Sequence, residues 1–219
     1  MPRKTPLPAR QARSRESLER LLQATQEILE KDGLDKATIP RIAKRAGLSA
    51  GAVYRRFPDK DALLRTLLLR FMQANAEKAE RVLKPELWEG RDLKTMVRSI
   101  FGGMVTSYRQ RRRLFRSFVQ FVDRHPDAAF RRRVEELEMR SIQKVNDLLL
   151  SRRSEIRHSD PERAISLGMM MVAFTLREIF VMFDQPLQPS DYLPMSDEQL
   201  NHELPYAFLR YLGVEENKT

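Results

Sequence analysis

Apolar side chains recur at the spacing of an α-helix along almost the whole chain, and this pattern restricts the fold more than any other feature of the sequence. Residues 14–33 show it clearly, because their inward positions form a single stripe at Leu18, Leu21, Leu22, Thr25, Ile28 and Leu29. Alternating runs of β-branched residues, which would indicate half-buried strands, are missing. The 42% hydrophobic content of the 219 residues is ample for a packed core. The sequence therefore predicts an all-α protein of about nine helices.

Glycine, proline and capping residues divide the first part of the chain into short helices. Gly33 supplies the left-handed residue that ends the first helix. Two starts are open for the second: Thr38 caps it with Pro40 in the first turn, or Pro40 is itself the first helical residue. Gly47 ends this helix, and Ser49 is suited to cap a third helix that runs to about residue 57.

The remainder is predicted to form longer helices. A fourth helix begins after Pro58, with Asp59 as its cap, and links the N-terminal unit to the rest over residues 59–84. Gly102 and Gly103 interrupt what would otherwise be a good helix. Beyond Pro85 the expected helices lie at roughly 92–110, 112–123, 126–152, 160–183 and 197–212.

Positive charge is concentrated at the N-terminal end. The net charge is +10, and residues 1–60 hold most of the excess of Lys and Arg. Residues 1–13 are rich in Pro and Arg and lack acidic side chains, so we expect a mobile basic arm that is either simply solvated or follows a groove of DNA. This distribution indicates a polyanionic partner, either nucleic acid or an anionic membrane surface. The arginine runs at 111–113 and 131–133 are expected to be solvated.

Other features argue against several classes of protein. Without cysteine the chain has no disulfides or thiolate metal sites, and the cytoplasm is the default compartment. The first residues lack the apolar stretch of a secretory signal. Residues 164–183 approach the length of a membrane span, but Arg177 and Glu178 interrupt them, so we expect a buried helix and no membrane contact. No metal-ligand spacing, phosphate-binding glycine loop or catalytic constellation is recognisable, so neither an enzyme nor a cofactor is expected.

The stretch RIAKRAGLSAGAVYRRFPDK, residues 41–60, predicts a helix-turn-helix. Val53 and Phe57 share the inward face of its second helix, while the outward face starts small and becomes aromatic and basic. Small leading residues let a helix backbone approach base edges in the major groove, and arginines donate forked hydrogen bonds to phosphates or guanine. The alternative is an ordinary helical hairpin with a solvated basic face.

The longer stretch TIPRIAKRAGLSAGAVYRRFPDKDALL, residues 38–64, resembles the DNA-binding signature of TetR-type bacterial transcriptional regulators. This resemblance implies that Thr38 and Lys60 contact phosphates and that Tyr54 touches a phosphate or a thymine methyl group. Arg55 and Arg56 are the expected base readers, although Arg56 stands where many members of the family have histidine. The remaining implied contacts are groove-entrance residues and backbone contacts from the second helix: Ser49, Ala50, Gly51, Arg41, and Lys44 or Arg45.

The same resemblance implies two domains with different functions. Residues 14–58 would form a three-helix DNA-binding domain, and residues 59–219 a helical effector-binding and dimerisation domain. The helices near 160–183 and 197–212 would form a homodimer that binds a palindromic operator as a repressor. A small-molecule effector would be bound by a pocket whose candidate residues are Met104, Tyr108, Phe118, Met170, Phe174 and Arg177. The alternatives are an architectural DNA-binding protein indifferent to sequence and a peripheral membrane protein that uses the basic arm.

Overall fold

The computed structural model describes residues 9–182 and 195–214, and this part of the chain is helical without a strand. Its eight α-helices confirm the predicted all-α class. Their bounds are α1 Ala9–Asp32, α2 Ile39–Ala46, α3 Ala50–Tyr54, α4 Lys60–Val82, α5 Leu93–Asp123, α6 Ala128–Leu150, α7 Pro161–Arg177 and α9 Asp197–Tyr211. Short 3-10 turns at Pro85–Trp88 and Arg153–Glu155 and a π-helical turn at Glu178–Met182 join or extend them.

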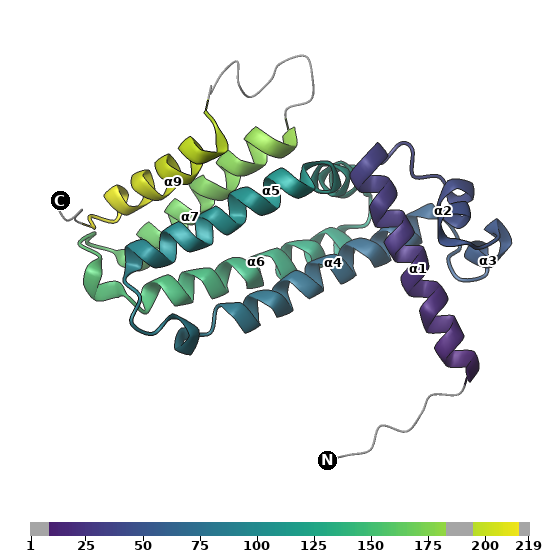
Figure 1. Cartoon of the computed structure of the whole chain (residues 1–219), viewed down its shortest axis with the longest axis horizontal. Coiled ribbons are helices and arrows are strands. Elements are labelled where there is room, and N and C mark those ends of the chain that lie inside the picture. The colour runs from purple at the N-terminus through teal and green to yellow at the C-terminus, as the bar shows by residue number, and fades with distance from the viewer. Residues whose placement is uncertain (1–8, 183–194, 215–219) are drawn as a thin grey trace.

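The helices form a small unit at one end of an elongated bundle (Figure 1). Helices α1, α2 and α3 make up the small unit, while α4 starts beside it and runs along α6 into the bundle. On the other side of the bundle α5 packs against α9, and α7 packs against α6 and α9. The long α4 therefore connects the two ends of the molecule.

Two hydrophobic cores hold this arrangement together. The C-terminal core lies among α5, α6, α7 and α9 and is centred on Phe101, Leu149, Ile165 and Phe208. The N-terminal core fills the space among α1, α2, α3 and the start of α4. It also takes in side chains from the α5–α6 end of the bundle, namely Leu114, Phe118, Phe130 and Val134. The DNA-binding unit expected from the sequence thus shares its core with helices that belong to the bundle.

Several helix boundaries differ from those expected. Helix α1 begins at Ala9 rather than Ser14, because residues 9–13 contain Ala, Gln and Arg, which favour the continuation of a helix. Residues 1–8 of the expected arm lie outside the described residues. Helix α3 ends at Tyr54, three residues before the expected end. The alternatives for the second helix are resolved in favour of a helix that begins at Ile39 with Thr38 at the N-cap.

Helix α5 spans the two helices expected at 92–110 and 112–123, and a kink at Arg111, whose φ and ψ are −113° and 18°, separates them where the break was expected. Gly102 and Gly103, which were expected to interrupt a helix, lie inside its first part without doing so. The Arg111 guanidinium lies 5.6 Å from the Phe71 ring centroid, and Arg113 donates a hydrogen bond to the Lys31 carbonyl oxygen. These two arginines therefore join α5 to α4 and α1, which corrects the expectation of a purely solvated run.

Helix α7 with its π-helical extension, Pro161–Met182, is long and apolar enough to span a membrane by length and composition alone. One face of it is part of the C-terminal core, as a buried helix would require: Ala164, Ile165, Gly168, Met169, Val172 and Leu176. The other face is exposed by 39–58% at Leu167, Met170, Met171 and Phe174. The prediction of a buried helix holds for one face only.

Candidate nucleic-acid interface

Local backbone chemistry sets the angle between α2 and α3. Gly47 adopts a φ of 66° and a ψ of 36°, and its N–H donates to the carbonyl oxygens of Ala43 and Lys44, which ends α2. A side chain at this φ would be strained, so glycine is required here. Leu48 is half-buried against the N-terminal core, and the Ser49 hydroxyl accepts a hydrogen bond from the Ala52 N–H at 3.2 Å. The predicted helix-turn-helix is thus present, with buried Val53 and Phe57 holding its second helix in place.

The outward face of α3 is open. Tyr54 is 55% exposed, and Ser49, Gly51 and Arg55 are exposed as well, while Ala50 is half-buried. A Cβ atom placed on Gly51 would approach only Arg55, at 3.9 Å from a guanidinium nitrogen. Packing among the residues that the structure describes therefore gives no reason for a glycine at this position. Close approach by an external partner is the reason that remains.

The basic side chains around α3 differ in whether they form hydrogen bonds within the chain. Arg56 donates hydrogen bonds to the Ser14 carbonyl and hydroxyl oxygens, both at 2.8 Å, and to the Ser17 hydroxyl oxygen at 3.2 Å. It therefore fastens the end of α3 to α1. Arg55 has no hydrogen bond or ion pair with the described residues. Of the two expected readers, only Arg55 has a guanidinium group that is not engaged within the described part of the chain.

The basic side chains of α2 that are expected to contact the DNA backbone also differ in whether they are ion-paired within the chain. Arg41 forms an ion pair with Asp32 at 2.5 Å, and Arg45 forms one with Glu27, also at 2.5 Å. The hydrogen bond from Arg45 lowers the pKa of the Glu27 carboxyl group. Both pairs are solvent-exposed, so exchanging the carboxylate for a phosphate costs little. Lys44 is exposed and has no ion pair within the described residues.

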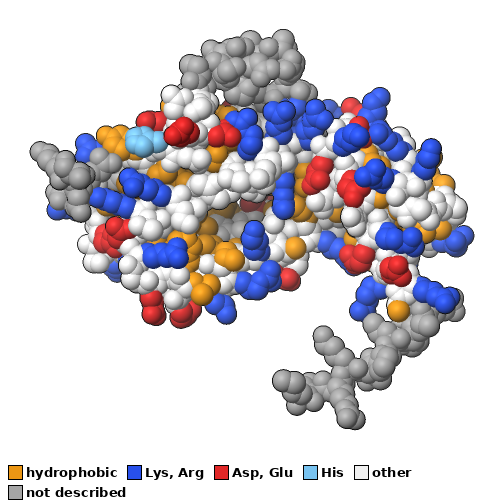
Figure 2. Space-filling model, in the orientation of Figure 1, with side chains coloured by type: hydrophobic (Ala, Val, Ile, Leu, Met, Phe, Trp, Pro, Cys, Tyr) orange, Lys and Arg blue, Asp and Glu red, His pale blue; other side chains and the backbone are white. Residues whose placement is uncertain are grey.

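The start of α4 completes the basic rim of this surface. Asp59 caps the helix by accepting a hydrogen bond from the Ala62 N–H at 2.7 Å, and Lys60 is the first helical residue. The exposed Thr38, at the N-cap of α2, makes no side-chain capping bond, so its hydroxyl is not used to start that helix. Figure 2 shows lysine and arginine side chains distributed over the small unit that carries these residues. Small, aromatic and cationic groups thus lie together on the α2–α3 end of the molecule.

The six candidate pocket residues do not come together. Phe118 is 7% exposed and belongs to the N-terminal core, where its ring centroid lies 5.2 Å from that of Phe71. This places it in a different core from Met104 and Tyr108 and apart from the cavity that Phe174 and Arg177 line. Met104 and Tyr108 are partly buried against the C-terminal core, and Met170 is exposed on α7.

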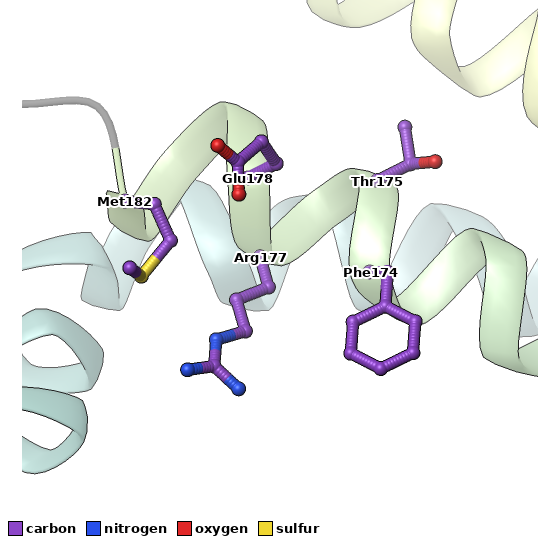
Figure 3. A pocket seen from close by; sticks show the side chains of 5 residues that line it. All are labelled: Phe174, Thr175, Arg177, Glu178 and Met182. Atoms are coloured by element: carbon purple, nitrogen blue, oxygen red, sulfur yellow. The ribbon is translucent and has the colours of Figure 1, made fainter. Parts of the chain in front are cut away.

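Two candidates, Phe174 and Arg177, do line an open cavity of about 530 Å³ at the end of α7. Met182, one of the methionines whose adaptable apolar surface suits a pocket, lines it too, and Thr175 and Glu178 do so without having been expected there. Figure 3 shows Phe174, Arg177 and Met182 on one side of the helix and Thr175 and Glu178 on the other. Phe174 and Arg177, three residues apart on α7, could have been grouped from helical spacing alone.

Tyr108 is electrostatically linked to this region. Burial raises the pKa of its phenol, the Glu138 carboxylate raises it further, and the Arg177 guanidinium acts in the opposite direction. Tyr108 therefore remains a neutral hydrogen-bonding group at physiological pH. Among the described residues no group of His, Asp and Glu side chains is placed to hold a metal ion.

Comparison with known proteins agrees with this geometry. Residues 21–67, which include the second half of α1, all of α2 and α3 and the start of α4, match the family described as bacterial regulatory proteins, tetR family. The chain is 35% identical over 85 residues to the HTH-type transcriptional regulator BetI of Stenotrophomonas maltophilia, which covers 39% of this chain. The matched segment is only 42% of that regulator's length.

Solved structures extend the likeness to the whole fold. A TetR-family regulator from Mesorhizobium loti has a TM-score of 0.67 at 22% identity and covers 90% of this chain and 97% of its own. The regulator FadR of Bacillus subtilis, solved in complex with stearoyl-CoA, has a TM-score of 0.61 at 17% identity and covers 90% of this chain and 99% of its own. The helix-turn-helix segment thus matches the TetR family of bacterial regulatory proteins over residues 21–67, and the whole chain has the fold of solved TetR-family regulators.

Proposed function

We propose that the chain is a transcriptional repressor that binds a palindromic DNA operator as a homodimer and is released by a small-molecule effector. The observation that carries the DNA-binding part is the outward face of α3, where Gly51 meets no internal neighbour except the flexible Arg55 side chain and where Tyr54 and Arg55 are exposed. A helix of this kind enters the major groove with its leading end close to the base edges. The proposed domains are the α1–α3 unit for DNA and the bundle from α4 onward for effector and dimer contacts.

In this proposal each residue has a defined role. Arg55 reads base edges, and Tyr54 contacts a phosphate or a thymine methyl group. Lys60, Thr38 and Lys44 contact phosphates, and the positive end of α4 adds to the attraction at Lys60. Arg56, which is bonded to Ser14 and Ser17, supports α3 instead of reading a base. The groove entrance is formed by Ser49, Ala50 and Gly51.

Dimer formation is supported by the apolar face of α7. Leu167, Met170, Met171 and Phe174 are 39–58% exposed on it, and Tyr206 of the adjacent α9 is 39% exposed. One α3 helix contacts only a few base pairs, whereas two copies related by a twofold axis contact two half-sites. A second copy packed on α7 and α9 would bury this face and fix the distance between the two α3 helices.

Effector release is supported by the bundle's open cavity at the end of α7, with its aromatic, thioether and guanidinium groups. FadR of Bacillus subtilis, which shares the fold, has been solved with stearoyl-CoA. An effector that binds one arrangement of the bundle better than another shifts the spacing of the α3 helices through α4. A differential affinity of about 1.4 kcal/mol already changes operator binding tenfold.

Selection of bound sequences from a random DNA pool tests the proposal. A recovered palindrome supports both sequence specificity and twofold symmetry. Recovery of unrelated sequences, with equal affinity for selected and random DNA and a steep loss of both in salt, would instead indicate an architectural DNA-binding protein. The molar mass of the free protein in solution, measured by light scattering, checks the dimer independently.

Two substitutions then test the assigned contacts on the selected sequence. Arg55→Ala should cost roughly 1–3 kcal/mol of binding free energy and relax the preference at one position of each half-site. Lys60→Ala should weaken all sequences alike and reduce the salt dependence of binding. Parental affinity and preference in both variants would refute the site assignment.

A further inference from the structure

The corner between α5 and α6 contains a histidine that touches the DNA-binding end of the molecule. The His125 side chain is only 4% exposed, and its ring packs against two aromatic rings, with centroids 5.2 Å from Phe121 and 4.6 Å from Phe130. No sequence feature had suggested a role for this residue. A histidine this deeply buried needs partners for both ring nitrogens, because an unpaired buried nitrogen is costly.

Both nitrogens are satisfied, and the partners fix where the ring proton lies. The Asp127 N–H donates a hydrogen bond to Nδ1 at 3.1 Å, so Nδ1 must carry a lone pair. The proton of the neutral ring is therefore on Nε2. Nε2 lies 3.1 Å from Oδ2 of Asp61 and donates to that carboxylate. One ring thus links the start of α6 to the first turn of α4.

Asp61 directly follows Lys60, the proposed phosphate contact, in the first turn of α4. A second link holds the next turn of α4 to the same corner. Arg65 forms an ion pair with Asp127 at 2.8 Å, and its guanidinium lies 5.0 Å from the Phe130 ring centroid. The start of α4 is therefore held by the end of the bundle on two successive turns.

We propose that His125 is a positioning residue for DNA binding, which sets the place of Lys60 against the DNA backbone by holding Asp61 in the first turn of α4. The proposal rests on the proposed phosphate contact of Lys60. Its physical basis is that Lys60 and Asp61 are consecutive in one helical turn, so a shift of one carries the other. Movement of the α5–α6 corner would then reach the DNA surface through this hydrogen bond without any change in α3.

Two matched pairs of variants isolate the hydrogen bond. Asp61 is 47% exposed, so Asp61→Ala and Asp61→Asn are both expected to fold, and both remove the same charge. Only asparagine keeps an oxygen that accepts from Nε2–H. In the second pair, His125→Gln keeps an amide donor near the place of Nε2, whereas His125→Asn is too short to reach Asp61. We expect Asp61→Ala to weaken operator binding about three- to tenfold relative to Asp61→Asn, and His125→Asn to weaken it by a similar factor relative to His125→Gln.

The decisive measurement is the same comparison in a Lys60→Ala background, by fluorescence anisotropy with the DNA recovered from the pool and with thermal unfolding as the check of folding. If His125 acts through Lys60, the difference within each pair disappears when Lys60 is absent. An equal difference in both backgrounds would overturn the positioning role and leave the phosphate contact intact. A Lys60→Ala variant that binds like the parent would refute the phosphate contact itself and, with it, this inference.

Discussion

Gly168 sets the distance between α7 and α9, and replacing it by alanine tests the packing of the bundle. A Cβ atom at this position would lie 2.5 Å from Cε2 and 2.7 Å from Cδ2 of Phe208. The Phe208 ring cannot easily move away, because it is 3% exposed and lies 5.0 Å from the Phe101 ring in the C-terminal core. Overpacking of this kind costs about 1–3 kcal/mol. The helix propensity of alanine offsets about 1 kcal/mol of that cost.

We therefore expect Gly168→Ala to lower the free energy of unfolding by about 2 kcal/mol, since the enclosed ring places the clash at the upper end of that range. Chemical denaturation at several protein concentrations measures the change and separates it from any loss of dimer. Gly103→Ala is the matched control: this residue also lies inside a helix, but a Cβ atom added to it would meet no atom within 4 Å, so the substitution should stabilise by about 0.5–1 kcal/mol. If both substitutions stabilise equally, the reasoning on the α7–α9 distance is wrong.

Three further predictions concern the DNA-binding unit and the bundle. Ser49→Ala removes the cap of α3 and should cost about 1 kcal/mol of stability in chemical denaturation, and a change near zero would contradict the capping role. Arg56→Ala should leave the sequence recovered from a random DNA pool unchanged, because its guanidinium is bonded to Ser14, whereas an altered preference at one position would make it a reader. Tyr108→Phe should change the pH dependence of stability. Burial raises the pKa of the Tyr108 phenol in the folded state. The contribution of this phenol to the free energy of unfolding is therefore constant below pH about 10 and is lost as the pH rises further. Urea unfolding at pH 9 and 11 should show a larger loss in the parent than in Tyr108→Phe, and equal losses would refute burial as the cause.

The parts of the fold that were predictable depend on chemistry within a few residues. The left-handed Gly47 and the caps at Ser49 and Asp59 were each expected from residue type and spacing, and each is present. The inward positions of Val53 and Phe57 follow from helical periodicity in the same way. Such signals are independent of the rest of the chain, which explains why the helix-turn-helix was the most predictable part.

The features that escaped prediction depend on contacts far apart in sequence. Periodicity indicates that Phe118 is buried, but not in which of two cores, because α5 contributes to both. Arg56 was expected on an outward helical face, yet α3 stops at Tyr54 and the side chain reaches Ser14 on α1. The role of His125 is visible only when α4 and the α5–α6 corner are placed together, since Asp61 lies 64 residues earlier. No local signal carries this information.

The sharing of the N-terminal core by Leu114, Phe118, Phe130 and Val134 has a consequence for engineering and for evolution. A chimaera that grafts residues 1–58 onto the bundle of another regulator would bring foreign side chains against α1 and α4, with mismatched volumes. The α1–α3 unit therefore cannot be exchanged by itself. A chimaera that folds has to include the matching ends of α5 and α6. Under the proposed function, new operator preferences are most easily acquired at exposed positions such as Tyr54 and Arg55, where a change disturbs no shared packing.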